Sequence, residues 1–247
     1  MKISIITVTY NSAATLEETI LSVINQTYQN IEYIIVDGKS TDSTLSIIDK
    51  HKDRIAKFIS EKDNGIYDAL NKGISMASGD VVGILHSDDF YTSNEVLQKI
   101  AERFNKDNSE ALYGDLLYVS KDNTNKIIRK WRAGEFKPNS FLFGWMPPHP
   151  TFFVKKEVYE KHKAFNLDFK TSADYELMLR LLYKHKIKTS YLSEFIVKMR
   201  MGGQSNVSTK NRIIANLEDR KAWEVNGLKP YFFTLFFKPL RKLSQFL

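Results

Sequence analysis

Short apolar runs alternate with amphipathic segments over the first 85 residues of the chain. Helices are predicted where apolar residues recur at helical spacing, as in Leu16, Ile20 and Val23, in Leu45 and Ile48, and in Ile66, Leu70 and Ile74. Strands are predicted where apolar residues follow one another, at residues 3–9, 31–36, 56–60 and 81–85. The spacing of Thr15 and Glu18 also predicts a capping box. Strands that alternate with helices in this way indicate an α/β fold with a mostly parallel sheet.

The pattern is less regular in the rest of the chain. Helices are predicted at residues 95–104, 173–184 and 211–223, and strands at residues 111–119, 126–132 and 190–199. Three prolines predict a loop at residues 144–150. No Pro/Gly/Ser-rich linker or internal repeat interrupts the chain. We therefore expect one domain over residues 1–227, with a regular half at 1–110 and a less regular half at 111–227, followed by a tail at 228–247.

Composition narrows the chemistry only slightly. The chain has 43% hydrophobic residues, enough for a core, and no cysteine, which excludes disulfides, a thiol nucleophile and Cys-ligated metal sites. Its formal charge of +7 indicates an anionic partner, either nucleic acid, a phosphate-bearing substrate or an acidic membrane surface. The first residues do not resemble a signal peptide, and no apolar run reaches the ~18 residues of a spanning helix. We therefore expect a soluble or peripheral protein.

Polar side chains follow the end of each of the first four strands, in the segments 9–11, 37–38, 62–65 and 86–89. In an open parallel sheet, ligands bind outside the carboxyl ends of the strands, so we expect the functional site there. Neither G-x-G-x-x-G nor G-x-x-x-x-G-K-[ST] occurs, which argues against dinucleotide and P-loop sites.

Asp88 and Asp89 form the sharpest local feature, directly after a predicted buried strand. Two adjacent carboxylates repel each other, and a hard divalent cation that bridges them to a ligand phosphate makes the arrangement favourable. The alternative is that the pair closes a turn or caps the next helix, because aspartates are common in both places.

Several motifs follow one another in an informative order, at residues 5–11, 36–44, 63–73, 79–89, 113–115, 148–153, 173–176 and 202–205. Together they resemble the family 2 glycosyltransferases with the GT-A fold, which are inverting enzymes that use nucleotide sugars. The resemblance spans residues 3–206. Within the family, the chain most resembles members from capsule, colanic-acid and O-antigen biosynthesis clusters. It implies a Rossmann-like, mostly parallel sheet flanked by helices, with a nucleotide-sugar-binding half at 1–110 and an acceptor-binding, catalytic half at 111–227.

The resemblance implies donor-binding roles for residues at the strand ends, namely Thr7, Thr9, Tyr10, Asp37, Asp63, Lys72 and Asp88. Asp37 would hydrogen-bond the nucleotide base, and Asp88 would face the ribose or a metal ion. Asp89 would be the direct ligand of Mn²⁺ or Mg²⁺ on the diphosphate. His86 is a candidate donor contact, with a histidine held by backbone at the strand end as the alternative. Residues 202–205 resemble a loop that closes over the nucleotide.

Residues 173–176 offer two candidates for a catalytic base, Asp174 and Glu176. Inverting transfer needs one carboxylate to take the acceptor proton while the diphosphate leaves. Helical spacing places Asp174 with Leu177, Met178 and Leu181, and Glu176 with Arg180 and Lys184, so we expect Asp174 to point inward and Glu176 toward solvent.

The resembled family also has its base at this aspartate, although its preceding glutamate is Ala173 here. A helix N-cap is the alternative role for Asp174. His149, between two prolines, and Glu176 are candidate contacts of the acceptor or donor.

The tail at residues 228–247 combines aromatic and basic residues and has no acidic residue. This composition is typical of an interfacial anchor on an anionic leaflet, and packing on the domain is the alternative. Residues 177–247 carry 14 basic and 4 acidic residues, whereas residues 1–176 carry 22 and 25, so the positive charge is concentrated at the C-terminal side.

The expected partners follow from this charge distribution and from the resemblance. They are a UDP-sugar donor, a saccharide or lipid-linked saccharide acceptor in surface polysaccharide synthesis, and the inner face of the plasma membrane, with no nucleic acid.

Two alternative functions remain open beside this interpretation. A sugar nucleotidyltransferase would be expected to have a glycine-rich basic loop after the first strand, where this chain has Tyr10, Asn11 and Ser12. A non-enzymatic polyanion binder would need basic and aromatic residues interleaved on one element, and outside the tail they are scattered.

Overall fold

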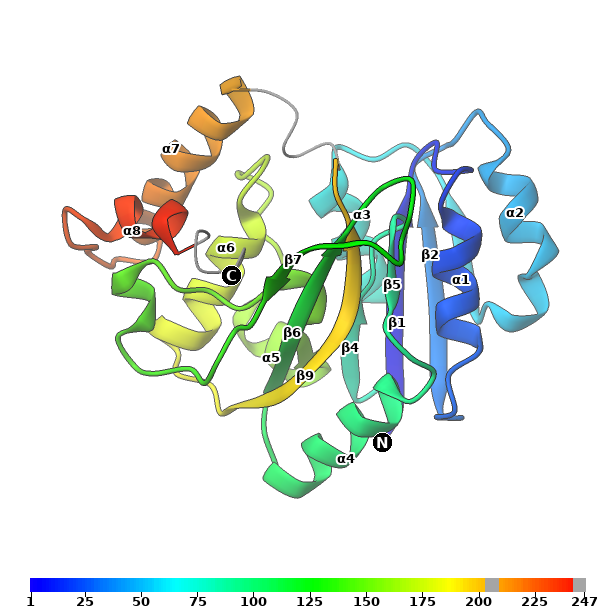
Figure 1. The fold of residues 1–247 in the computed structure, drawn as a ribbon, viewed down its shortest axis with the longest axis horizontal. Helices are drawn as coiled ribbons and strands as arrows, with labels where there is room; N and C mark the ends of the chain where they lie inside the picture. Colours follow the sequence, from blue (N-terminus) through cyan, green and yellow to red (C-terminus); the bar gives the residue numbers. More distant parts are fainter. Residues whose placement is uncertain (203–208, 242–247) are drawn as a thin grey trace.

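The computed structural model, which describes residues 1–202 and 209–241, is built around a mixed sheet of nine strands in the order β3-β2-β1-β4-β8-β6-β9-β5, with β7 paired to β6 (Figure 1). The strands are β1 (Ile3–Thr9), β2 (Ile31–Asp37), β3 (Lys57–Ser60), β4 (Val81–Ile84), β5 (Asp89–Tyr91), β6 (Ala111–Val119), β7 (Ile127–Trp131), β8 (Phe153–Lys155) and β9 (Thr189–Arg200). The first four are parallel neighbours, with β1 between β2 and β4, as the alternation of strands and helices predicts.

Helices cover both faces of this sheet. They are α1 (Leu16–Ile24), α2 (Thr44–Lys50), α3 (Ile66–Met76), α4 (Val96–Asp107), α5 (Lys156–His162), α6 (Ala173–Met178), α7 (Thr209–Val225) and α8 (Thr234–Leu240). Three 3₁₀ turns, η1 (Lys52–Arg54), η2 (Ser140–Phe143) and η3 (His149–Thr151), and a π-helical turn at Leu179–Lys184, which extends α6, complete the description. Figure 1 shows α1 and α2 beside β1 and β2, whereas α6, α7 and α8 gather at the opposite side of the molecule.

Two hydrophobic clusters, one on each face of the sheet, follow from the alternation of side chains along β1 and β2. Ile6 and Ile34 pack on the face that also holds Leu70 of α3 and the buried residues of α6. Ile5 and Ile35 pack on the opposite face, against α1 and α4. Both faces are covered, so most positions of β1 and β2 are apolar, with a few buried polar residues such as Ser4, Thr7 and Glu32 between them.

The second half of the sheet departs from the parallel pattern. The three-residue strand β8 pairs antiparallel with both β4 and β6 and thereby joins the two halves of the sheet. β6 and β9 are parallel, with a register shift at Gly114–Leu116. Strands as short as β5 and β8 are below the length at which periodicity identifies a strand, which is why the sequence did not predict them.

The predicted capping box at the start of α1 is wrong. Thr15 makes no side-chain cap, and its hydroxyl donates instead to the carbonyl oxygen of Ser87, 2.8 Å away. Glu18 is turned toward the guanidinium of Arg200, which comes from β9. Long-range partners have therefore replaced the local hydrogen bonds that the Thr15–Glu18 spacing offers.

The described part of the tail, residues 228–241, packs on the domain. The Thr234 hydroxyl donates to the carbonyl oxygen of Leu142 over 2.7 Å, and the Lys238 ammonium lies 2.7 Å from the buried carboxylate of Asp219. Gly144 permits this close approach, because a Cβ there would lie 2.4 Å from the backbone nitrogen of Lys238. Residues 228–241 thus pack on the domain, which was one of the two interpretations of the tail. The other interpretation, binding to a membrane, now depends on the side chains of this segment that remain exposed.

Candidate active site

The carboxyl ends of β1, β2 and β4 meet at one edge of the sheet, and the N-terminus of α6 approaches this edge from the second half of the chain. Thr9 and Asp37 are register partners at the ends of β1 and β2, and His86 and Asp88 follow β4. The shared edge explains why polar residues that are far apart in the sequence come close together in the fold.

Asp174 of α6 is the centre of this arrangement. The Tyr67 hydroxyl of α3 donates to its Oδ1 over 3.2 Å, and Nδ1 of His149 lies 3.3 Å from its Oδ2. The carboxylate keeps 22% of its surface exposed, so a substrate hydroxyl can reach it. Burial and the charge of Asp174 raise the pKa of Tyr67, which keeps the phenol protonated and able to donate. Asp174 was expected to be the inward-pointing residue of the pair Asp174 and Glu176, but its side chain is 22% exposed and that of Glu176 only 2%, so the predicted order of exposure is reversed.

His86 completes a polar cluster around this carboxylate. Its ring packs edge-on against that of His149, with centroids 5.5 Å apart. Burial, together with the charge of a protonated His149, lowers the pKa of His86 to about 3, so the His86 ring is neutral at physiological pH. The structure therefore brings together four side chains from four separate parts of the chain, namely Tyr67, His86, His149 and Asp174.

Glu176 does not point toward solvent, and that prediction is wrong. Only 2% of its side chain is exposed, and its carboxylate forms a two-pronged ion pair with Arg180, over 2.8 and 3.0 Å. Asn226 donates a further hydrogen bond to it over 2.9 Å. Helical spacing correctly placed Glu176 and Arg180 on one face, but it could not show that the residues after α7 cover that face. Glu176 therefore anchors the helix that carries Asp174 instead of facing the site.

The two aspartates after β4 lie in different environments. Asp89 is the first residue of β5 and has no exposed surface, and burial beside the negative Asp88 raises its pKa well above the usual value. Within residues 1–202 and 209–241, neither oxygen of Asp89 has a hydrogen-bonding partner. Asp88 is partly exposed; burial raises its pKa, and nearby Arg200 and His149 oppose that shift.

The predicted roles of the two aspartates stay predictions, namely Asp89 as the direct ligand of a metal ion and Asp88 as a residue that faces the ribose or the metal. Asp88 is partly exposed and Asp89 is fully buried, so a ligand that approaches from the surface meets Asp88 first. Arg200 holds the Asp88–Asp89 turn in place by donating to the Asp88 carbonyl oxygen over 2.5 Å. Sequence alone could not show which of the two neighbouring aspartates is buried, because the burial of Asp89 depends on its pairing with Met199 of β9.

A divalent cation fits this edge of the sheet in one specific way. In the part of the chain that the structure describes, no three His, Asp or Glu side chains are grouped to hold a metal ion by themselves. Mg²⁺ is usually bound by one or two carboxylates together with substrate phosphates and water. The partly exposed Asp88 and the buried Asp89, whose oxygens have no hydrogen-bonding partner among the described residues, match that donor set once a diphosphate supplies the remaining oxygens.

The residues predicted to line the nucleotide differ in how accessible they are. Tyr10 is 59% exposed at the end of β1, whereas Thr7 is fully buried, and its hydroxyl accepts a hydrogen bond from Tyr33. Thr9 is almost fully buried. Asp37 also has no exposed surface, because its carboxylate accepts hydrogen bonds from the hydroxyl groups of Ser40 and Ser60 (2.5 and 2.6 Å). Its contact with a base stays a prediction.

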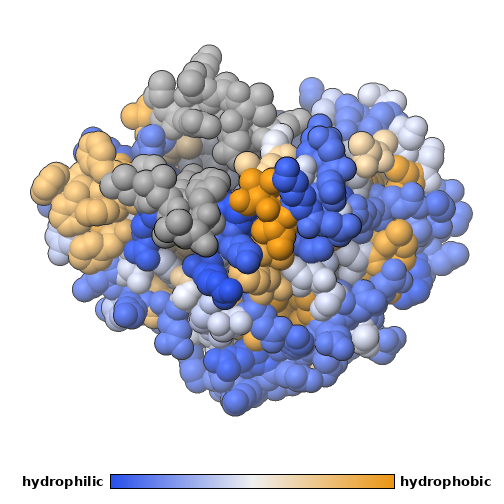
Figure 2. Space-filling model, in the orientation of Figure 1, coloured by the Kyte–Doolittle hydropathy of each residue, from blue (hydrophilic) through white to orange (hydrophobic). Residues whose placement is uncertain are grey.

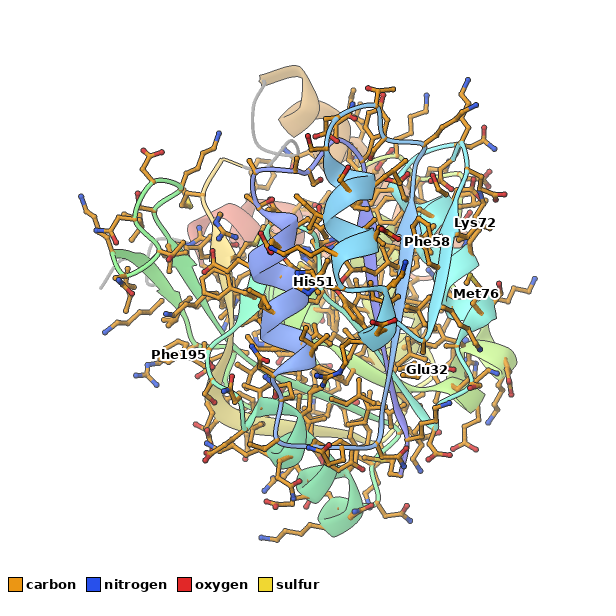
Figure 3. The ribbon with its side chains drawn as sticks, turned by 90° about the vertical axis from the view of Figure 1, so that its right-hand side faces the viewer. Glu32, His51, Phe58, Lys72, Met76 and Phe195 are labelled. Atoms are coloured by element: carbon orange, nitrogen blue, oxygen red, sulfur yellow. The ribbon has the colours of Figure 1, made fainter. Side chains whose placement is uncertain are left out.

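Asp63 and Lys72 form the side of the site next to β2. The Lys72 ammonium lies 2.7 Å from Asp63 and 2.7 Å from Glu61, and these carboxylates raise the pKa of Lys72. A Cβ at Gly38 would lie 3.2 Å from Oδ2 of Asp63 and 3.4 Å from the Tyr10 ring, so the three residues form one continuous wall. Figure 3 shows Lys72 toward the upper end of this side of the molecule, far from Glu32 at the other end of the sheet.

The predicted closing loop is seen only at its first residue. Gly202 is described, with φ near +100°, whereas residues 203–205 of that motif lie outside the described residues. Tyr67 was given no role of its own from the sequence; its signals were its place in the motif at residues 63–73 and on the helix that follows the third strand.

Comparisons with known proteins concern the sequence and the fold of the chain. Residues 4–166 match the family model described as glycosyl transferase family 2. An uncharacterized glycosyltransferase of Mycobacterium tuberculosis (strain H37Rv) is 33% identical over 180 residues, which cover 72% of this chain and 68% of that protein.

Solved structures share the fold at lower identity. Staphylococcus aureus TarS 1–349, in complex with UDP-GlcNAc, superposes with a TM-score of 0.69 over 92% of this chain, at 18% identity. A mannosyltransferase from Pyrobaculum calidifontis, in complex with GDP-Man and Mn²⁺, superposes with a TM-score of 0.61 over 97% of this chain and 73% of that one, at 15% identity. The chain spans 65% of that TarS fragment and 39% of a longer TarS structure. At these identities the likeness establishes a GT-A fold.

Proposed function

Because the chain belongs to glycosyl transferase family 2, we propose that it moves a sugar from a nucleotide-diphosphate sugar to an acceptor hydroxyl with inversion at the sugar carbon. The observation that carries this proposal is a partly exposed carboxylate, that of Asp174, held by Tyr67 and His149 close to the strand ends where the family binds its donor. The TarS structure with UDP-GlcNAc supports a UDP-sugar as the donor.

In this mechanism Asp174 acts as the general base. It takes the proton of the acceptor hydroxyl while that oxygen attacks the sugar carbon, and the diphosphate leaves on the opposite side. Tyr67 and His149 orient the two carboxylate oxygens, so that the base needs little rearrangement before reaction. No second carboxylic acid is required, because the diphosphate leaves without needing a proton.

Asp88 would hold a divalent cation together with the diphosphate, and Arg200 would keep the Asp88 turn rigid. When bound, such a cation stabilises the negative charge that develops on the departing diphosphate. Tyr10 and Asp63 would form the wall beside the nucleotide, with Asp63 oriented by its ion pair to Lys72. Thr7, Thr9 and Asp37 would support this wall from beneath, since they are buried.

Incubation of the protein with a panel of UDP-, GDP- and dTDP-sugars and Mn²⁺ tests the proposed function. We expect slow hydrolysis of one donor class, with water as the acceptor, and a thermal shift with the same donor. A sugar nucleotidyltransferase would instead form a nucleotide sugar from a nucleoside triphosphate and a sugar phosphate. Activity in that assay, without donor hydrolysis, would contradict our proposal.

The acceptor is proposed to be a lipid-linked saccharide that the enzyme meets at the inner face of the membrane. In the described part of the chain, no helix is both long and apolar enough to cross a bilayer. However, Phe232 and Phe236 are 87% and 70% exposed, beside exposed Phe143 and Tyr231. Figure 2 shows this light-orange patch at the left of the molecule, where α8 and the loop before it lie. Exposed aromatics on a strongly basic C-terminal portion fit the interface of an anionic bilayer.

A double substitution, Phe232→Ser with Phe236→Ser, is expected to weaken binding to phosphatidylglycerol-containing vesicles at least about tenfold, because burial of one Phe contributes roughly 1.5–3 kcal/mol. Co-sedimentation with vesicles measures the change. Phe58→Ser is the matched control, since Phe58 is 47% exposed on β3, at the opposite side of the molecule (Figure 3). Equal sedimentation of the double variant and the control would contradict the membrane proposal.

A further inference from the structure

We propose that Glu218 of α7 is a positioning residue for the proposed catalytic base, because its carboxylate holds the turn from which α6 presents Asp174 to the acceptor hydroxyl. This inference rests on the proposed function of Asp174. Glu218 acts through the backbone that leads into α6 and takes no part in the bond changes of the transfer. The motifs at the strand ends do not include α7, so nothing in the sequence links Glu218 to the candidate site.

Three successive backbone N–H groups before α6 donate to the Glu218 carboxylate. The N–H of Lys170 donates to Oε1 over 2.8 Å, and the N–H groups of Thr171 and Ser172 donate to Oε2 over 2.8 and 2.9 Å. The Thr171 hydroxyl donates to the same Oε2 over 2.8 Å. Both oxygens of one side chain therefore bind the turn that ends directly before Ala173, the first residue of α6.

This contact replaces the cap that α6 lacks. Ser172 precedes the helix, at a position where a serine usually caps the first N–H groups with its own hydroxyl. Here Ser172 makes no side-chain cap, and its hydroxyl donates to the carbonyl oxygen of Ala215 on α7, 3.3 Å away. A helix as short as α6 is only marginally stable by itself. Its start is therefore set by contacts with α7.

Further contacts place α7 along a side of α6 that does not carry the base. Nε1 of Trp223 donates to the Tyr175 hydroxyl over 2.9 Å, and Asn226 donates to Glu176 over 2.9 Å. Asp174, in contrast, meets side chains from α3 and η3. α7 thus holds α6 on one side while Asp174 faces the site on another, and release of the first turn would move the base relative to the acceptor.

The ionised form of Glu218 suits this role. Burial by itself would raise the pKa of Glu218, but the hydrogen bonds from the turn outweigh burial and lower the pKa below its ordinary value. The side chain is therefore a carboxylate at neutral pH. Hydrogen bonds from N–H groups to a carboxylate are roughly twice as strong as those to a neutral acceptor, so loss of the charge should loosen the turn.

Glu218→Gln tests the inference. The amide keeps the size of the side chain, but it has one acceptor oxygen fewer and places an NH₂ group against backbone N–H donors. Misplacement of a reacting group by about 1 Å can cost on the order of 10²-fold in rate, so we expect turnover for donor hydrolysis to fall at least about tenfold. The KM for the donor, and the donor affinity and stoichiometry measured by calorimetry, should stay unchanged.

A double-mutant cycle separates positioning from a structural role. If Glu218 acts through Asp174, addition of Glu218→Gln to Asp174→Asn should not lower the residual turnover further. A general loss of structure would instead lower the residual turnover by the same factor as in the single variant. Unchanged donor stoichiometry in Glu218→Gln would show that the fraction of folded protein is the same.

Two control variants match the chemical change and the loss of stability. Glu224→Gln makes the same substitution at an exposed position of α7 and should keep full turnover. Ser4→Ala removes a hydrogen bond of 2.6 Å to another buried carboxylate, that of Glu32, at the far end of the sheet (Figure 3). It should lower the Tm and leave turnover unchanged well below that temperature.

Several outcomes would overturn the inference. Full turnover in Glu218→Gln would do so, as would a second, equal loss in the double variant. A fall in donor stoichiometry, or an equal loss of turnover in Ser4→Ala, would assign the effect to unfolding. If the unsubstituted protein hydrolysed no nucleotide sugar, the proposed function itself would fail, whereas an active protein with unaffected Glu218→Gln rejects only this inference.

Discussion

Replacement of Asp174 by asparagine is expected to abolish sugar transfer while donor binding is retained. Asparagine keeps the size of the side chain and can still accept the hydrogen bond from Tyr67, but it cannot take a proton. General-base catalysis contributes typically about 10²–10⁴-fold, so turnover should fall by at least ~10²-fold. Initial rates of nucleotide release measure the loss, and titration of the donor, followed by calorimetry, measures the retained affinity.

Asp168→Asn is the matched control for this variant. Asp168 is an exposed carboxylate six residues before Asp174, on the loop that leads into α6. It should keep full activity, which shows that a charge change in this region is tolerated. Substantial turnover in Asp174→Asn would show that Asp174 is not the catalytic base.

Replacement of Asp88 by asparagine is expected to have the second largest effect. Asp88 is the accessible carboxylate of the pair after β4, and its loss should remove the protein ligand of a cation on the diphosphate. Stabilisation of the leaving charge by such a cation is worth several kcal/mol, so we expect turnover to fall by about 10²–10³-fold. The Mn²⁺ concentration that gives half-maximal rate should also rise, which kinetic titration with Mn²⁺ measures.

Asp89→Asn distinguishes the two neighbouring aspartates. Asp89 has no exposed surface, so a neutral amide of the same size at this position should keep the response to Mn²⁺. If Asp89→Asn loses that response and Asp88→Asn keeps it, the assignment of the ligand to Asp88 is wrong. If both variants respond normally, the cation is not held at this edge of the sheet.

The first half of the fold could be predicted closely from the sequence. β1 and β2 occupy the residues expected for them, apart from one position at the end of β2, because strands buried on both faces are continuous apolar runs. The position of the site at the carboxyl ends of these strands followed from the same pattern. The short strands β5 and β8 could not be predicted, since three residues contain less than two periods of side-chain alternation.

The candidate site was predicted as a set of residues, but not as an arrangement. Helical spacing on α6 predicted that Asp174 points inward and Glu176 toward solvent, whereas 22% of the Asp174 side chain and only 2% of the Glu176 side chain are exposed. Spacing along one helix carries no information about what packs on that helix. The residues after α7 cover Glu176 and supply Asn226, so the glutamate pairs with Arg180 in the interior. In the sequence, a buried ion pair of this kind has the same residue types and spacing as an exposed one.

The sequence by itself determined the α/β framework, the order of its motifs and the residue types available for chemistry, because these depend on local periodicity and on the ends of buried strands. Only the tertiary structure decided which of these side chains meet. It brought His149 and Tyr67 to the two oxygens of Asp174, and it buried Asp89 while leaving Asp88 accessible. Contacts between distant segments follow from packing of the whole chain, and no local pattern encodes them.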